Sequence, residues 1–157
     1  MTIDFLIKAL PSDNFHEIML KNNAELELEC AAWITVDADP GYPCRVSLSD
    51  AKIGERVLVL SFCHHNVNSS YRASGPIFVR EKAQTVNLAI NEVPKNLRQR
   101  LLSIRAYNSK KIMIEAEVVQ GTELESSMDR QFQNNEVEYI HIHHAKPGCF
   151  SCSVHRA

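Results

Sequence analysis

Long apolar runs and an excess of positive charge are both missing from this sequence of 157 residues. No run approaches the roughly 20 apolar residues of a membrane-spanning helix, so no membrane partner is expected. Seventeen basic residues stand against nineteen acidic ones, a formal net charge of −2. Nucleic-acid binders usually carry a basic excess, so no nucleic-acid partner is expected either. The first residues have no basic segment followed by a small-residue cleavage site, which predicts a cytoplasmic location.

Signatures of the familiar enzyme classes are missing too. The sequence has no P-loop, no Gly-x-Ser-x-Gly elbow, no Gly-x-Gly-x-x-Gly turn and no His-Glu-x-x-His motif. It also lacks the two correctly spaced ligand pairs of a zinc knuckle, so we predict no metal site and no cofactor. The sequence therefore leaves open whether the protein is an enzyme.

The cysteine pattern disfavours a disulfide scaffold. The five cysteines are odd in number and widely spread: Cys30, Cys44, Cys63, Cys149 and Cys152. In a reducing compartment they are expected to be free thiols, which serve as core side chains, metal ligands or nucleophiles. Cys149 and Cys152 form a Cys-x-x-Cys motif, but its flanks have a strand pattern, whereas redox motifs of this kind begin helices. The less favoured alternative is a loose zinc site that joins Cys44 and Cys149 to His141 and His143.

Hydrophobic periodicity predicts an α+β fold in a single domain over residues 1–157. The expected strands cover residues 3–9, 33–36, 56–63, 75–80, 101–107, 111–119, 136–143 and 149–155, and the expected helices begin near residues 12, 94 and 123. Most of the strands follow one another through short turns, which favours a largely antiparallel β-sheet with two or three short helices. Residues 56–63 are rich in valine and leucine, as in a buried central strand. Residues 25–29 fit a helix and a strand equally well.

The last two predicted strands carry candidate catalytic residues. Alternation places His141 and His143 on one face of the first strand, with Ile140 and Ile142 on the opposite, core face. In the second strand, Phe150, Cys152 and Val154 are expected on the core face. Cys149 begins that strand and could face the histidines. A cysteine nucleophile needs a neighbouring base, so Cys149 with His141 or His143 is the candidate catalytic group.

A loop at residues 68–75 carries candidate ligand-binding residues. Arg72 offers a planar guanidinium fork, while Tyr71, Ser74 and the Gly75 amide offer further donors to an oxyanion. Arg45 follows a turn with two prolines and could serve the same anion. The alternative is a structural role, in which these arginines pair with nearby carboxylates.

Three segments carry a family resemblance: residues 40–48 (PGYPCRVSL), residues 71–79 (YRASGPIFV), and residues 139–143 (YIHIH) with 147–150 (PGCF). Together and in this order they resemble a family of uncharacterised, mainly bacterial proteins, the domain of unknown function number 1203. The resemblance implies one domain and no assigned activity. The adjacent His64 and His65 are not expected as a feature of that family.

Three hypotheses about function remain, in this order. The first is a domain whose polar pocket, built by Arg45, Arg72 and the two strand histidines, binds a small anionic ligand. Its anion binding would strengthen as pH falls through the histidine range near 6.5. The second is an enzyme with a thiol nucleophile, and the third is a Cys/His metal-binding protein. The sequence does not show the oligomeric state, the ligand, or whether Cys44 and Cys149 approach each other.

Overall fold

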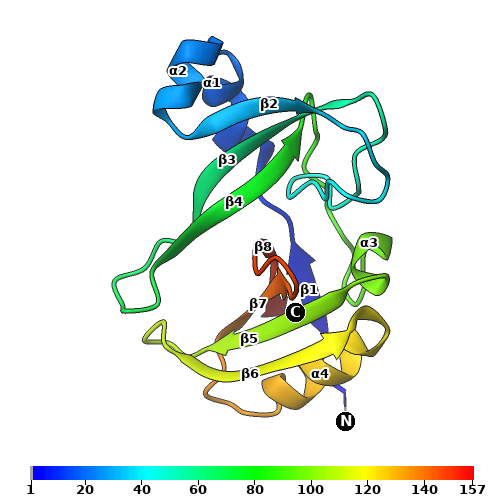
Figure 1. The fold of residues 1–157 in the computed structure, drawn as a ribbon. Coiled ribbons are helices and arrows are strands. Elements are labelled where there is room, and N and C mark those ends of the chain that lie inside the picture. The colour runs from blue at the N-terminus through cyan, green and yellow to red at the C-terminus, as the bar shows by residue number, and fades with distance from the viewer. Residues whose placement is uncertain (1) are drawn as a thin grey trace.

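The computed structural model describes residues 2–157, which form two antiparallel sheets (Figure 1). One sheet has five strands in the order β1-β8-β7-β5-β6, and the other has three in the order β2-β3-β4. The five-stranded sheet contains β1 (Phe5–Lys8), β5 (Leu101–Tyr107), β6 (Met113–Gln120), β7 (Tyr139–His144) and β8 (Phe150–Arg156). The three-stranded sheet contains β2 (Ala31–Thr35), β3 (Arg56–His65) and β4 (Ala73–Arg80). The predicted α+β class and antiparallel pairing are confirmed, and β3 is the central strand of its sheet.

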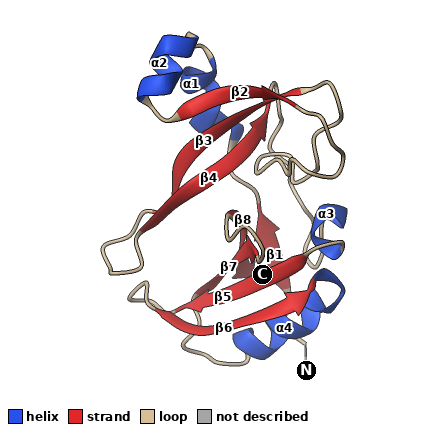
Figure 2. Cartoon of the chain, viewed as in Figure 1, coloured by secondary structure: helices blue, strands red, loops and turns tan. Residues whose placement is uncertain are grey.

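The helices are short and more numerous than predicted (Figure 2). The part of the chain that the structure describes has four α-helices: α1 (His16–Met19), α2 (Asn23–Leu28), α3 (Lys95–Arg98) and α4 (Leu124–Phe132), with 3-10 turns at Ser12–Phe15 and Gly121–Glu123. Residues 25–29, which the sequence left open, lie mostly in α2. The Asn22 side chain accepts from the Glu25 amide and the Glu25 side chain accepts from the Asn22 amide. This capping box favours the helix over a strand.

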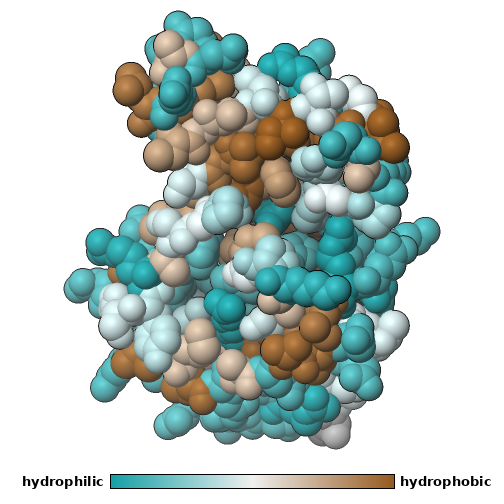
Figure 3. Space-filling view, viewed as in Figure 1, coloured by the Kyte–Doolittle hydropathy of each residue, from teal (hydrophilic) through white to brown (hydrophobic). Residues whose placement is uncertain are grey.

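Each sheet has its own apolar cluster. On the five-stranded sheet, Ile140 and Ile142 pack with Ile104 and with Met128 and Phe132 of α4, which lies on the side away from the other sheet (Figure 1). On the three-stranded sheet, the cluster includes Leu58, Leu60, Ile77, Val79, Phe15 and Leu26. The surface in Figure 3 is most hydrophobic over this smaller sheet. The isoleucines thus take the core face, as their alternation predicted.

Two β-bulges turn extra side chains into the space between the sheets. The register of β3 against β4 shifts between Phe62 and His65, and both His64 and His65 contact rings of the five-stranded sheet. The register of β7 against β8 shifts beside Ile142, which brings Phe150 opposite His143. The prediction that Phe150 shares the core face with Cys152 is therefore wrong, because a bulge inserts one residue and reverses the alternation.

The state of the cysteines and the length of the helices also bear on the sequence-based expectations. All five cysteines are free thiols in the structure. Within residues 2–157, no helix has the length and apolar character needed to cross a membrane.

Candidate functional site

Arg45 is a buried cation at the centre of the candidate site. It follows the turn at Pro43 and is 1% exposed. Its Nε donates to the Phe150 carbonyl at 2.6 Å, its Nη1 donates to the Pro43 carbonyl, and its Nη2 lies 2.9 Å from Cys149 Sγ. The side chain therefore joins the loop between β2 and β3 to the start of β8, which is more than a hundred positions away in the chain.

The charge of Arg45 has no carboxylate counterpart among residues 2–157. None of the ion pairs among residues 2–157 includes it. Burial lowers the pKa of Arg45, while the neighbouring Cys149 works to raise it. An arginine keeps its proton in proteins, so this is a buried positive charge. Such a charge is costly unless an anion accompanies it.

Arg45 lines a pocket of about 400 Å³, the Arg45 pocket, together with Phe78, Arg100, His144, Lys146 and Cys149. His144 is 4% exposed, and neither of its ring nitrogens has a hydrogen-bond partner among the described residues. Burial, assisted by the charges of Arg45 and Arg100, lowers the pKa of His144 to about 3. The pocket therefore offers a neutral imidazole beside three cationic side chains, those of Arg45, Arg100 and Lys146.

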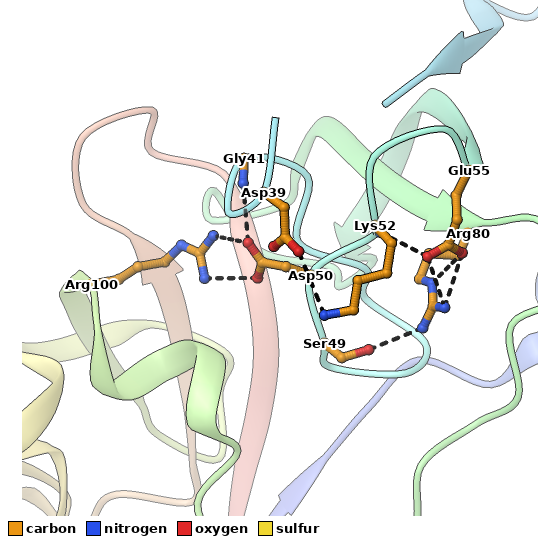
Figure 4. Close-up of polar contacts among 8 residues, drawn as sticks. All are labelled: Asp39, Gly41, Ser49, Asp50, Lys52, Glu55, Arg80 and Arg100. Carbon is orange, nitrogen blue, oxygen red and sulfur yellow. Dashed lines mark hydrogen bonds and ion pairs between the residues drawn. The ribbon is translucent and has the colours of Figure 1, made fainter. Parts of the chain in front are cut away.

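The charge of Arg100 is already compensated. Its Nη1 and Nη2 donate to the two carboxylate oxygens of Asp50 at 3.0 and 2.6 Å (Figure 4). The Gly41 amide donates to the same carboxylate at 3.1 Å. This bidentate pair fastens the loop between β2 and β3 to the start of β5. It leaves Arg45 and the exposed Lys146 as the net positive charges of the pocket.

A second group, the histidine cluster, consists of His64, His141 and His143. One ring nitrogen from each lies within 4.8 Å of the other two. His141 and His143 come from β7, on the face opposite Ile140, and His64 comes from the bulge of β3. Phe150 stacks on His64, with ring centroids 5.2 Å apart. The cluster thus forms where the two sheets face each other.

The histidine cluster is uncharged at neutral pH. Burial is the largest cause in each case: it lowers the pKa of His64 to about 4, of His141 to about 2 and of His143 to about 4. Neighbouring histidines lower all three pKa values further, and Arg105 lowers those of His64 and His143. The expectation that the histidines add positive charge near pH 6.5 is therefore wrong. It treated them as exposed, whereas His141 and His143 are 6% and 1% exposed.

The predicted catalytic and ligand-binding residues do not form one site in the structure. Arg45 and Cys149 share the Arg45 pocket, whereas His141 and His143 belong to the histidine cluster. The Cys149 thiol makes no hydrogen bond to either histidine ring within residues 2–157; its side-chain partner is Arg45. The expected nucleophile and base are thus not paired.

Four predicted ligand-binding residues lie outside the Arg45 pocket. Tyr71 and Arg72 belong to the loop between β3 and β4, whereas Ser74 and Gly75 belong to β4 itself. Arg72 is exposed and its Nε donates to the Val67 carbonyl at 3.1 Å. Ser69 Oγ of the same loop donates to the Lys111 carbonyl at 2.8 Å, at the end of the sheets away from α3 (Figure 1). Arg72 therefore has a local contact with the backbone, and none of the ion pairs among residues 2–157 includes it.

Sequence reasoning missed His64, His144 and Arg100. His64 was set aside because it falls outside the family motifs, yet it supplies the third member of the histidine cluster. His144 follows His143 directly, so alternation places it on the other face of β7 from the histidine cluster. Sequence reasoning ended the predicted strand at His143 and gave His144 no role. Arg100 lies near the predicted helix at residue 94, and only the tertiary contact with Asp50 reveals its place.

The comparison with protein families shows to which family the chain belongs. A family model described as "Protein of unknown function (DUF1203)" matches residues 41–156. The chain belongs to this family. The matched range begins at the turn before Arg45 and includes every member of the Arg45 pocket and of the histidine cluster, whereas β1, α1, α2 and β2 precede it. No curated protein and no solved structure matches the chain.

Proposed function

We propose that this family member binds a small anionic ligand in the Arg45 pocket. The observation that carries the proposal is the buried guanidinium of Arg45, which has no carboxylate partner. Each terminal nitrogen of an arginine carries two N–H groups, and Nη1 and Nη2 of Arg45 each contact one acceptor. Each of these nitrogens thus has a second N–H, and a guanidinium group suits a carboxylate or a phosphate.

The other walls of the pocket fit such a ligand. Lys146 adds a second positive charge at the exposed rim, and the Phe78 ring lies 6.0 Å from the Arg45 guanidinium carbon. His144 has both ring nitrogens free, one to donate and one to accept. A volume of about 400 Å³ is at the small end of ligand pockets. The expected ligand is therefore a small carboxylate or phosphate compound with an additional polar group.

A thiol-dependent enzyme is the second candidate. The observation in its favour is that Cys149 and His144 line the same pocket. The His144 imidazole, rather than that of His141 or His143, would then be the base. In this reading the anion recognised by Arg45 is part of a substrate that reacts with the sulfur.

Alkylation of Cys149 tests the anion proposal. Iodoacetate and iodoacetamide react with the same thiolate but differ in charge, so the ratio of their rates reports the local preference for an anion. We expect this ratio at Cys149 to exceed the ratio at the exposed Cys30 by about 10-fold, on the scale of a charged hydrogen bond. Mass spectrometry of peptides reads both cysteines in one sample. Added phosphate should slow labelling of Cys149 and leave Cys30 unchanged.

Two variants separate the alternatives. Lys146→Gln changes the exposed rim without disturbing Arg45 and should lower the ratio at Cys149. Cys149→Ser should keep a phosphate-induced rise in melting temperature if the pocket binds anions without thiol chemistry. Equal ratios at Cys149 and Cys30, with no protection by phosphate or small carboxylates, would contradict the proposal.

A further inference from the structure

The histidine cluster presents ring nitrogens that no protein group engages. Nδ1 of His64, Nδ1 of His141 and Nε2 of His143 are buried and have no hydrogen-bond partner among residues 2–157. Buried polar atoms are normally paired, because an unpaired one loses its hydration without compensation. Three of them on neighbouring rings indicate a common partner that accepts lone pairs.

His143 is oriented as metal-binding histidines usually are. Its Nδ1 lies 2.9 Å from the Gly148 carbonyl, so Nδ1 carries the proton and Nε2 carries the lone pair. Ligating histidines commonly donate their second ring nitrogen to a carbonyl in this way, which fixes the tautomer and the ring. Gly148 holds that carbonyl in a turn with a φ of +81°, a conformation that favours glycine.

We propose that the histidine cluster binds one divalent transition-metal ion of the zinc class, with His64, His141 and His143 as its ligands. Neutral imidazole suits zinc, cobalt, nickel and copper ions. Zinc–nitrogen distances are about 2.0–2.1 Å. Nitrogens within 4.8 Å of one another therefore reach a single ion after small side-chain rotations. Three histidines leave the fourth tetrahedral position for water or an anion.

Two cationic side chains and the partial exposure of one ligand determine how an ion meets the cluster. Arg105 faces the three histidines, since it lies opposite His141 in the β5–β7 register, and Arg45 lies beside the cluster through its bond to the Phe150 carbonyl. Their charges oppose a dication but attract an anion to the fourth position. His64 is only partly buried, so an ion can reach the cluster from its side.

This inference goes beyond the anion proposal, and it reverses the sequence-based prediction of no metal site. That prediction rested on spacing within the sequence. The three ligands come from two sheets, and His64 is 77 positions before His141. A short sequence motif cannot identify ligands that lie so far apart in the chain.

Metal titration of the full chain tests the proposal. The protein is stripped with a chelator, dialysed, and titrated with Zn²⁺ by calorimetry and with Co²⁺ by visible absorption. We expect one ion per chain and the strong visible bands of tetrahedral Co²⁺, without the near-ultraviolet band of a cobalt–thiolate bond. In His64→Gln and His143→Gln the affinity should fall by more than the roughly 10–100-fold that loss of an outer-shell partner costs. His155→Gln, on β8 outside the cluster, should bind like the wild type.

Three outcomes would overturn the proposal: no binding of either ion, equal binding by both cluster variants, or a cobalt–thiolate band. Circular dichroism shows whether the variants fold. If they do not, the wild-type chain still decides, because Zn²⁺ must shift the ring-nitrogen signals of three of the seven histidines. Unshifted signals would also overturn the proposal. Failure here leaves the anion proposal standing, since alkylation of Cys149 tests that one separately.

Discussion

Replacing Gly121 with alanine is expected to lower the free energy of unfolding by about 3–4 kcal/mol. A Cβ at this position would lie 1.8 Å from the Leu97 carbonyl oxygen and 2.8 Å from the Arg98 Cα. Both atoms belong to the backbone of α3, so no side-chain rotation relieves the overlap. Gly121 also donates its amide to the Arg100 carbonyl at 2.8 Å. The clash therefore displaces the segment that supplies Arg100 to the Arg45 pocket.

Urea unfolding measures this loss, with Gly75→Ala as the matched control. A Cβ on Gly75 would meet no atom within 4 Å, so its effect should stay within about 0.5 kcal/mol. The same variants connect stability with the site. Gly121→Ala should also reduce the preference of Cys149 for iodoacetate, whereas Gly75→Ala should not. If the two variants were equally stable, the close approach of Gly121 to α3 would be refuted.

Local sequence patterns were sufficient to predict the strands of this fold. Ile140 and Ile142 alternate with histidines because one face of β7 packs against α4, and an alternating pattern is what a half-apolar strand needs. The apolar run of β3 likewise identified a central strand. In these segments a residue's neighbours in sequence determine its environment, so the prediction needs no tertiary information.

The candidate site depends on tertiary contacts that local patterns do not contain. Two bulges decide where His64 and Phe150 point, and a bulge leaves no periodic signal in the sequence. Arg45 meets Cys149 across more than a hundred residues. Sequence reasoning selected both of these residues, but it grouped them with Arg72 and with histidines that the fold places elsewhere. Residue type therefore identified the candidates, and only the packing of the two sheets shows which ones meet.

Removing the Asp50 charge should also destabilise the protein, by about 2–3 kcal/mol. The side chains of Arg100 and Asp50 are 19% and 9% exposed, and breaking a buried pair leaves its partner charge uncompensated. The estimate stays below the value for a fully buried pair because solvent screens the remaining charge. Asp50→Asn keeps the side-chain size, and urea unfolding at neutral pH gives the difference. The exposed pair of Arg56 with Glu81 provides the control, since Glu81→Gln should cost less than about 1 kcal/mol.

The pH dependence of the stability difference between the wild type and Asp50→Asn identifies its electrostatic origin. Burial works to raise the pKa of Asp50, but the hydrogen bonds and charge of Arg100, together with hydrogen bonds from Gly41 and Asn96, outweigh it and hold the pKa below the ordinary value of 3.8. A carboxyl whose pKa is lower in the folded state stabilises the fold above its unfolded pKa and loses this effect as pH falls through its native pKa. The gap between wild type and Asp50→Asn should therefore stay constant from about pH 7 to about pH 5 and shrink below about pH 4.

In the variant, Arg100 adds an unpaired charge to the Arg45 pocket, so phosphate should stabilise Asp50→Asn more than the wild type. A gap that already closes between pH 7 and pH 5, or equal stabilisation by phosphate, would show that the ion pair does not control the charge of this pocket.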